Sequence, residues 1–458
     1  MAMNTPRPLS GFPELLPAQR MVEQQIIDGL RRTFELHGFA PIETRAVEPI
    51  QRLTGGGEID KEIYAVRRLA DLGDSGNDDA EGGLGLHFDL TVPFARYVLE
   101  NAGRLDFPFR RYQIQKVWRG ERPQGGRFRE FTQADIDIIA KDVLAFHHDI
   151  EVARVMGEVL AALPAQVPAL RLQVSNRKLL QGFLTGIGAP DVAGAMRVID
   201  KLDKVPTEVI GDLLRTDTGL SAEQVKVCLE FAGIRTTDTS FVERVRALGV
   251  QDPALEEGLG ELAAVLEACA DLAPGRVSVE ADLRIARGLD YYTGTVFETR
   301  MLGYEALGSI CSGGRYDSLA SDGRTTYPGV GISLGLSRLL IPLFADGTLR
   351  ASRNVPSAVL VALADEESRD ATNLVAQALR ARGIPTEVSA AAEKYGKQIR
   401  FAQRRGIPYV WFPRTAPESE HEVKNIDSGE QVPADPDTWL PPAQDLTVAI
   451  DAAPSTAE

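Results

Sequence analysis

The feature that most constrains the fold of this 458-residue chain is a pair of alternating segments between residues 109 and 139. Polar and apolar side chains alternate in RYQIQKVWRG and again in EFTQADIDIIA, which is the period of a β-strand. The connecting segment ERPQGGRFR is charged and contains two glycines. The sequence therefore predicts an antiparallel hairpin with a long loop.

The second strand of this hairpin carries polar groups on one face. Because side chains two residues apart lie on the same side of a strand, four residues should point the same way: Phe131, Gln133, Asp135 and Asp137. Arg119 and Arg127 could direct guanidinium groups at phosphates, while Phe131 offers a flat surface for a base. The alternative is an ordinary amphipathic strand with one solvated face.

The N-terminal part predicts further elements. Apolar residues recur within residues 17–37, and Gly38 follows, as in an amphipathic helix that ends at a glycine. FAPIETRAVEP suggests a strand, and GLHFDLTVPFARYVLE a strand and a helix. Residues 71–85 contain five glycines and five acidic residues and should form a mobile loop or hairpin tip.

Helical patterns dominate from about residue 175 to 275, which indicates a helical insertion. Strand-like segments return in VSVEADLRIARGLDYYTGTVFETR and continue to YPGVGISLGLSRLLIPLF. After Arg353, short apolar strands alternate with helices, as in a small α/β domain with a largely parallel sheet. Beyond about residue 414 the chain is rich in proline and acidic residues, and we expect weak order there apart from one edge strand near LTVAI.

Composition excludes several classes of protein. With 44% hydrophobic and 25% charged residues, the chain is typical of a globular protein of about three domains. No apolar run approaches the ~20 residues of a membrane span, and the N-terminus lacks a secretory pattern, so we expect a cytoplasmic protein. The three cysteines are far apart, and His147 with His148 lacks matching carboxylates, so no metal site is predicted.

Basic residues gather in two places, although the net charge is -15. Residues 104–129 contain eight Lys or Arg against two acids, and residues 394–405 contain five Lys or Arg and no acid. Both groups could be solvated faces. Together they could also contact separate parts of one polyanion, such as a nucleic acid.

RGLDYYTGTVFE, residues 287–298, places an arginine, an aspartate and two tyrosines beside two glycines. These groups suit a polar ligand better than a hydrophobic core. The alternative is a hairpin edge with interface tyrosines. The chain has neither a P-loop nor a dinucleotide-binding glycine pattern, so a bound nucleotide would need other contacts.

Several separated segments resemble one family. WRGERPQGGRFREFTQADIDI resembles the second signature motif of class II aminoacyl-tRNA synthetases, in the form typical of histidyl-tRNA synthetases. RGLDYYTGTVFE and CSGGRYDSL resemble the two histidine-specific motifs of that family, and GVGISLGLSRLL resembles the third class II motif. The segment from Gly11 to Pro49 is similar to the first motif, which forms the dimer interface.

The resemblance implies a role for each matching residue. Asp89 and Thr91 would contact the α-amino group of histidine, and Gln133 and Asp137 its amino group and imidazole. Tyr291, Tyr292 and Tyr316 would line the imidazole pocket. On the ATP side the resemblance implies Arg119 for the carboxylate and α-phosphate, Glu121 and Phe131 for adenine, and Arg338 for the γ-phosphate. Arg287, with Arg119, would act catalytically by stabilising charge on the α-phosphate.

The chemistry suits these residue types. Attack of a carboxylate on the α-phosphorus builds negative charge, which fixed guanidinium groups stabilise without reorganisation. An imidazole needs a partner for each ring nitrogen, and a tyrosine with a carboxylate supplies both. Amino acids without ring nitrogens would leave those groups unpaired and be rejected.

The resemblance also covers the C-terminal module, KYGKQIRFAQRRGIPYVWF, which is similar to the anticodon-binding domain of class II synthetases. Its basic helix would face the tRNA, although an ordinary amphipathic helix is an alternative. The loop ERPQGGRFR would meet the acceptor end of the tRNA, which in this family carries an extra 5′ guanosine.

Some positions depart from the family pattern. Ser337 stands where the third motif often has Glu, Ser312 and Ser318 stand where small residues such as Gly are common, and DLT replaces a frequent EGT. These departures affect details of the ATP and magnesium contacts. The main rival is a catalytically silent paralogue, the histidine-sensing regulatory subunit of ATP phosphoribosyltransferase, which generally lacks the anticodon domain and the ATP arginines.

The resemblance implies an α+β architecture. A class II catalytic domain over residues 1–345, an antiparallel sheet flanked by helices, would be interrupted by the helical insertion at about 175–275. An anticodon-binding α/β domain would follow over residues 354–450. We expect a homodimer that uses ATP with Mg²⁺, the metal being held largely by phosphates.

Overall fold

The computed structural model describes residues 6–54, 58–69, 83–285, 291–416 and 418–451. The chain divides into two compact units: the larger comprises Met1–Pro13 and Ile27–Pro342, and the smaller comprises Leu343–Glu458 together with Glu14–Ile26. Most of the predicted loop at 71–85 lies outside the described residues.

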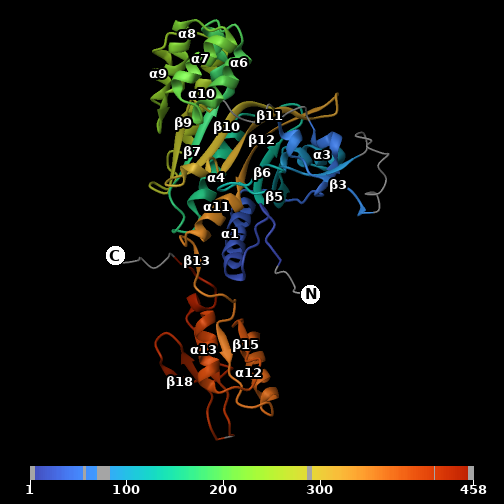
Figure 1. Cartoon of the computed structure of the whole chain (residues 1–458), viewed down its shortest axis with the longest axis vertical. Helices are drawn as coiled ribbons and strands as arrows, with labels where there is room; N and C mark the ends of the chain where they lie inside the picture. Colours follow the sequence, from blue (N-terminus) through green and yellow to red (C-terminus); the bar gives the residue numbers. More distant parts are fainter. Residues whose placement is uncertain (1–5, 55–57, 70–82, 286–290, 417, 452–458) are drawn as a thin grey trace. The chain divides into compact units, whose positions relative to one another are not determined.

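A nine-stranded sheet forms the centre of the large unit (Figure 1). Its strands, in spatial order, are β1 (Ala40–Pro41), β5 (Phe109–Trp118), β6 (Glu130–Ile139), β12 (Thr326–Gly335), β11 (Cys311–Ser321), β10 (Tyr292–Met301), β7 (Leu170–Asn176), β9 (Val277–Asp282) and β8 (Arg235–Thr236).

The predicted hairpin is confirmed as β5 and β6, which pair antiparallel from Phe109 opposite Ile139 to Trp118 opposite Glu130. The sheet as a whole is mixed. The six strands from β5 to β7 are antiparallel neighbours, but β1 pairs parallel with β5 and β7 pairs parallel with β9. The expected antiparallel pairing is therefore correct for the six central strands and for β8 with β9, and it fails only for β1 with β5 and for β7 with β9. β7 and β9 can run parallel because a long helical connection separates them.

The first helix, α1 (Pro17–Leu36), begins and ends within a residue of the prediction, and Gly38 follows at φ +76°. The single strand expected in FAPIETRAVEP is wrong: β1 joins the large sheet, whereas β2 (Val47–Pro49) pairs with β4 (Leu84–Leu86) in a small sheet that also contains β3 (Ala65–Val66). A short helix, α2 (Ile50–Leu53), follows β2.

Two helices cover opposite faces of the sheet. Phe94 and Val98 of α3 (Thr91–Asn101) pack with Tyr316 of β11 in one buried cluster. The neighbouring residue Arg315 must point to the other face, where it pairs with Asp149 of α4 (His147–Ala161). Both nitrogens Nε and Nη2 of Arg315 contact the Asp149 carboxylate, at 3.1 and 2.7 Å.

The helical insertion is confirmed between β7 and β9, and most of its helices gather beyond that edge of the sheet (Figure 1). Its helices are α5 (Arg177–Gly186), α6 (Val192–Ile199), α7 (Thr207–Thr218), α8 (Ala222–Ala232), α9 (Phe241–Arg246) and α10 (Pro253–Ala268). Local signals set their ends: Asn176 and Asp191 cap α5 and α6, a capping box of Ser221 and Gln224 opens α8, and Asp252 caps α10. The large unit ends in α11 (Leu336–Ala345).

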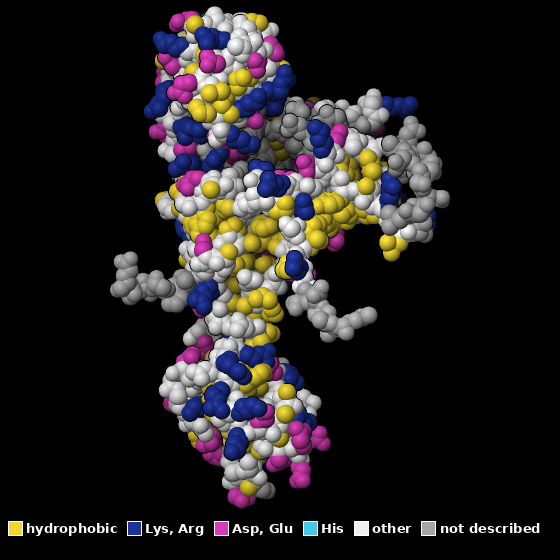
Figure 2. All heavy atoms as spheres, viewed as in Figure 1, with side chains coloured by type: hydrophobic (Ala, Val, Ile, Leu, Met, Phe, Trp, Pro, Cys, Tyr) yellow, Lys and Arg dark blue, Asp and Glu magenta, His cyan; other side chains and the backbone are white. Residues whose placement is uncertain are grey.

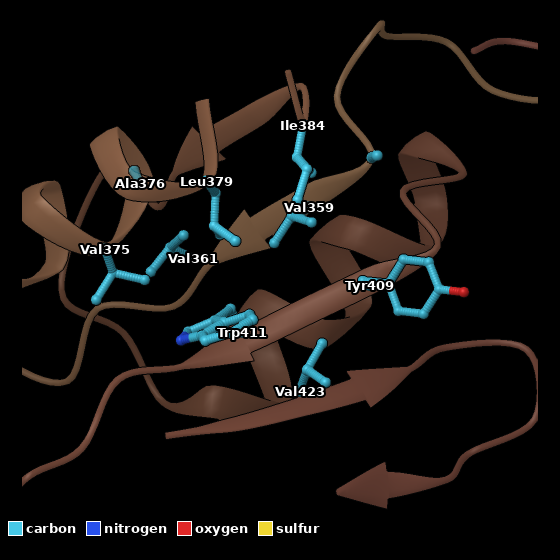
Figure 3. Packing of buried hydrophobic residues seen from close by; sticks show 10 residues of the cluster. Val359, Val361, Val375, Ala376, Leu379, Ile384, Tyr409, Trp411 and Val423 are labelled. Carbon is cyan, nitrogen blue, oxygen red and sulfur yellow. The ribbon is translucent and has the colours of Figure 1, made fainter. Parts of the chain in front are cut away.

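The C-terminal unit contains a five-stranded sheet in the order β15-β14-β16-β17-β18. Its elements are β14 (Val359–Val361), α12 (Arg369–Ala381), β15 (Thr386–Val388), α13 (Tyr395–Arg405), β16 (Tyr409–Phe412), β17 (Glu422–Asn425) and β18 (Gln431–Pro433). The first three strands pair in parallel, as predicted, and bury a core that includes Val361, Leu379 and Trp411 (Figure 3).

The expectation of weak order after residue 414 is wrong. β17 and β18 extend the sheet antiparallel, and Val423 is buried against Trp411 in the same core. The edge strand expected near LTVAI is β19 (Ile450–Asp451), which pairs with β13 (Arg350–Ala351) in a separate two-stranded sheet. Proline and acidic content thus did not prevent order, because alternate residues of β17 still face the core.

The three cysteines are unpaired and buried. Within the described part of the chain, no helix is both long enough and apolar enough to cross a membrane.

The buried pair between Arg315 and Asp149 predicts a stability difference. Replacing Arg315 by Met would leave the fully buried Asp149 carboxylate unpaired, so we expect a loss of about 3–5 kcal/mol in the free energy of unfolding. Arg110→Met is the matched control, since Arg110 pairs with half-exposed Glu151 of the same helix and should cost below about 1 kcal/mol. Urea unfolding of both variants measures the difference, and equal losses would contradict the argument.

Candidate active site

One face of the central strands, the face covered by α3, carries rows of polar residues. Residues that pair across neighbouring strands point to the same side, so each row crosses several strands. The first row contains Arg111, Asp137, Gly331 and Gly314, and the second contains Gln113, Asp135, Ser333 and Ser312. The predicted common face of Gln133, Asp135 and Asp137 is confirmed, and the alternative of a solvated face is wrong because all three are buried.

Glycines open the space in which the first row's polar side chains lie. A Cβ atom on Gly331 would lie 2.1 Å from Oδ1 of Asp137, and one on Gly329 would lie 2.4 Å from the Tyr316 ring. A Cβ atom on Gly314 would lie 3.0 Å from the Tyr292 ring. The glycines of CSGGRY and YPGVG therefore leave the space that the carboxylate of Asp137 and the rings of Tyr292 and Tyr316 occupy.

Asp137 and Tyr316 form the closed end of the site. The Tyr316 hydroxyl donates to Oδ1 of Asp137 at 2.8 Å, and Arg111 Nη2 lies 2.6 Å from Oδ2. Thr91 and Tyr292 line the same small cavity, whereas Tyr291 lies beside it, with its ring at 85° to the ring of Tyr316 and the two centroids 6.1 Å apart. Tyrosine hydroxyls and a carboxylate thus meet at one small cavity.

Asp89 lies at the N-terminus of α3, where its Oδ1 accepts from the Val92 amide at 3.1 Å. Its other carboxylate oxygen, Oδ2, is buried and has no hydrogen-bond partner among the described residues. A buried carboxylate oxygen without a donor is costly, so this atom is suited to a cationic or N–H ligand.

Burial shifts the titration of three carboxyl groups in this site. It raises the pKa of Asp89 to about 6, although the Val92 amide and the nearby arginines act to lower that pKa. It raises the pKa of Asp137 to about 6, although Arg111 and the Tyr316 hydroxyl act to lower that pKa. Burial also raises the pKa of Asp135 to about 7, and Asp135 bonds to the Ser333 hydroxyl, which in turn accepts from Gln133.

A second, larger pocket adjoins the first, and both are lined by Ser312 and Ser333. Its lining includes Arg119, Glu121, Arg127, Phe131, Gln133 and Arg338. Arg127 pairs with Glu121 at 3.1 Å, but the pocket still holds more positive than negative side chains. Burial and the neighbouring Arg127 and Arg119 lower the pKa of Arg338, and its buried Nε has no partner among the described residues. An anion would relieve this repulsion.

The aromatic face predicted for a base is present in this pocket. The guanidinium carbon of Arg119 lies 5.1 Å from the centroid of the Phe131 ring, and Arg119 Nε donates to the Phe88 carbonyl at 3.1 Å. Phe131 therefore offers its remaining surface to the pocket, beside a cation.

Comparison with known proteins identifies the family. A family model described as histidyl-tRNA synthetase matches residues 11–339, and one described as anticodon binding domain matches residues 357–440. A histidine–tRNA ligase of Cutibacterium acnes is 56% identical over 448 residues, covering 96% of this chain and 97% of that protein. One of Micrococcus luteus is 57% identical over 452 residues, with the same coverage.

The chain belongs to the histidyl-tRNA synthetase family.

A solved structure agrees with this assignment. The crystal structure of histidyl-tRNA synthetase from Nostoc sp. PCC 7120 superimposes with a TM-score of 0.81 at 32% identity, covering 95% of this chain and 97% of that one. The class II fold predicted from the motifs, with a C-terminal anticodon-binding domain, is therefore confirmed. An ATP phosphoribosyltransferase regulatory subunit/histidyl-tRNA synthetase from Bacillus halodurans also superimposes, with a TM-score of 0.69, but at 19% identity that likeness concerns the fold alone.

The structure brings most of the predicted site residues of this synthetase together. Thr91, Asp137, Tyr292 and Tyr316 line the smaller cavity, and Asp89 and Tyr291 adjoin it. The predicted ATP residues Arg119, Glu121, Phe131 and Arg338 line the larger pocket, together with Gln133. Arg287 lies outside the described residues, so its role stays a prediction.

Other residues of the synthetase site were missed at the level of sequence. Arg111 was counted only among the basic residues of 104–129, yet it is fully buried and paired with Asp137. The alternation of Arg111, Gln113 and Gln115 in the first hairpin strand was the available signal, since a polar residue at every second position predicts a polar face. The basic residues of 104–129 do not form one surface, because Arg110 pairs with Glu151 and Lys116 pairs with Glu130.

The departure at Ser337 of the synthetase has a structural role. Its hydroxyl accepts from the backbone amide of Thr132 at 2.9 Å, so it joins the start of α11 to β6. Ser312 lines both pockets, where its small side chain leaves room between them.

The glycine at 331 predicts a sharp effect on histidine binding. Gly331→Ala would place a methyl group 2.1 Å from Oδ1 of Asp137 and 2.7 Å from the Ile136 carbonyl, and the backbone contact cannot relax cheaply. We expect the KM for histidine to rise at least about a hundredfold, since a displacement of ~1 Å can cost that much. Gly260→Ala in α10, where a Cβ atom meets nothing within 4 Å, is the control. Pyrophosphate exchange measures both, and an unchanged KM in Gly331→Ala would contradict the assigned pocket.

The carboxyl pKa values predict a pH dependence for the unmodified enzyme. Asp137 is ionised above about pH 6 and becomes protonated below it, so it loses its ability to accept an imidazole N–H as the pH falls. Free histidine becomes charged near its ordinary pKa of about 6.5 over the same range. The KM for histidine should therefore rise by more than about tenfold between pH 7 and pH 5.5, while the KM for ATP changes less. Parallel changes in the two KM values would contradict this assignment.

Proposed function

We propose that this synthetase binds histidine in the smaller cavity and ATP in the larger pocket, with the reacting atoms between them near Ser312 and Ser333. The observation that carries the proposal is the buried pair of Asp137 and Tyr316 at the end of a cavity that opens onto a cluster of arginines. The cavity of Asp137 and Tyr316 suits a neutral ring with two nitrogen atoms, and the arginine-lined pocket suits a polyphosphate.

The histidine contacts follow from the donors and acceptors present. Asp89, whose Oδ2 lacks a partner among the described residues, takes the α-ammonium group together with Thr91. Asp137 accepts from an imidazole N–H, and Gln133 lies two positions along the same strand face, beyond Asp135 and towards the ATP pocket. The hydroxyls of Tyr291, Tyr292 and Tyr316 complete the imidazole pocket.

ATP would lie in the arginine-rich pocket. Phe131 and Glu121 hold the adenine, Arg338 the γ-phosphate, and Arg119 the α-phosphate and the histidine carboxylate. Arg119 and Arg287 are the proposed catalytic residues, because they can stabilise the charge that develops on the α-phosphate. Among the described residues no three His, Cys, Asp or Glu side chains could hold a metal ion together, so we propose that Mg²⁺ enters with ATP as part of the substrate.

The reaction of the family has two steps. A carboxylate oxygen of histidine attacks the α-phosphorus of ATP, the bond to the β-phosphate breaks, and pyrophosphate leaves. The resulting histidyl-adenylate is then attacked by a hydroxyl of the terminal adenosine of histidine tRNA, which releases AMP. The chain's own arginines contribute fixed positive charge to the first step and need no proton transfer.

We further propose that α13 faces the tRNA. Lys394, Lys397, Arg400 and Arg404 are exposed on or beside this helix, and Lys and Arg side chains gather on that face of the C-terminal unit (Figure 2). An ordinary helix would not need four exposed cations against one nearby acid, Glu393. The proposed domains are residues 1–345, with an insertion at about 175–275, and residues 354–450.

A homodimer is proposed for the assembly. Apolar side chains form a band across the large unit in Figure 2, and Leu9 and Leu36 are 66% and 81% exposed. Large apolar surfaces on a folded unit mark interfaces. Since tRNA is charged where proteins are made, the proposed location is the cytoplasm.

A charging assay tests the function. Purified protein would be given MgATP, total tRNA and each amino acid separately, and we expect histidine alone to be attached to tRNA. If histidine binds and stabilises the fold but nothing is charged, the histidine-sensing regulatory reading replaces the enzyme. If neither binding nor charging occurs with histidine, the assigned pocket is wrong.

A further inference from the structure

Arg111 is a fully buried cation in the middle of the histidine site. It extends from β5 on the same face as Asp137, has no exposed surface, and lies with its guanidinium carbon 4.5 Å from the centroid of the Phe94 ring. A buried guanidinium is costly unless it is paired, and its pairing here is with Asp137 Oδ2 at 2.6 Å. The same Nη2 also donates to the Leu90 carbonyl at 3.4 Å, so Asp137 is the carboxylate that it contacts among the described residues.

The two oxygens of Asp137 are held from opposite sides. Tyr316 donates to Oδ1 and Arg111 contacts Oδ2, so the carboxylate plane is fixed before any ligand enters. Each carboxylate oxygen can accept a second hydrogen bond, which leaves Asp137 free to accept an imidazole N–H.

The charges around Asp137 need a fixed cation. Asp135 lies on the same strand, Asp89 approaches from the start of α3, and the hydroxyls of Tyr292 and Tyr316 face Asp137 from β10 and β11. Asp89 has the substrate α-ammonium as its proposed partner, and Asp135 has the Ser333 hydroxyl. Arg111 remains as the cation that balances Asp137.

We propose that Arg111 is a positioning and specificity-determining residue for histidine, whose fixed charge keeps the Asp137 carboxylate ionised and aimed at the imidazole. This inference rests on the proposed histidine site. With Arg111 in place the pocket is balanced for a neutral ring, so a cationic side chain would add an unpaired charge. Removing only that charge should make Asp137 hold a proton at neutral pH.

The sharpest test changes the charge of Arg111 and keeps a hydrogen bond. Arg111→Gln can still donate to Asp137 but carries no charge, and Arg111→Lys keeps the charge with fewer donors. Arg110→Gln is the matched control, because Arg110 points to the opposite face of β5 and pairs with Glu151. The KM for histidine, the KM for ATP and kcat would be measured by pyrophosphate exchange from pH 5.5 to pH 9.

We expect the histidine KM of Arg111→Gln to rise at least about tenfold at pH 7 and to approach the wild-type value by pH 9. That corresponds to a rise of about two units in the pH at which Asp137 ionises. The ATP KM and the kcat at saturating histidine should stay within about threefold, and Arg111→Lys should keep the wild-type midpoint. A pH profile of Arg111→Gln that coincides with wild type, or an equal loss in both KM values, would overturn the proposal.

Thermal melting of each variant checks that the variant is folded. If Arg111→Gln does not fold, the double variant Arg111→Met with Asp137→Asn leaves no charge of this pair unpaired and takes its place. Its histidine KM should then change between pH 5.5 and 7.5 only as far as the imidazole itself titrates, and a profile as steep as wild type would overturn the proposal. A wild-type enzyme that exchanges pyrophosphate with no dependence on histidine would instead refute the proposed function.

Discussion

The constraint on which this structure depends is the pairing of buried charge on one face of the central sheet. Arg111, Asp137, Asp135 and Asp89 are all nearly inaccessible to water, and a buried charge without a partner costs several kcal/mol. Each therefore has a partner among the described residues: Arg111 pairs with Asp137, Asp135 with the Ser333 hydroxyl, and one oxygen of Asp89 with the Val92 amide of α3. The hydrophobic cluster around α3 holds these groups in place. The neighbouring glycines are there because the buried polar side chains need the space.

The same constraint separates the two halves of the site. Asp137 lines the smaller cavity and is paired with Arg111, so an uncharged ring can be recognised there by hydrogen bonds. The larger pocket has an excess of arginine, which is stable only if a polyanion binds or solvent screens it. The two meet at small side chains, Ser312 and Ser333, which leave space between a ligand of one and a ligand of the other.

Much of this could be predicted from local pattern. The hairpin, the first helix and the helical insertion follow from periodicity and from glycine or capping residues at their ends. The common face of Gln133, Asp135 and Asp137 follows from the two-residue period of a strand. The errors arose where pairing depends on distant segments: β1 and β9 join the sheet in parallel, and β17 and β18 extend the C-terminal sheet despite a composition typical of disorder.

The sequence alone determined the family, the reaction class and most of the charged and aromatic residues that line the two pockets, because the motifs are short and their side chains alternate regularly. Only the tertiary structure decided what Arg111 does. In the sequence it is one of eight basic residues between 104 and 129, and nothing local distinguishes it from Arg110. The register of β5 against β6 turns Arg111 towards Asp137 and Arg110 towards solvent-accessible Glu151, and burial then makes one pair strong and the other weak.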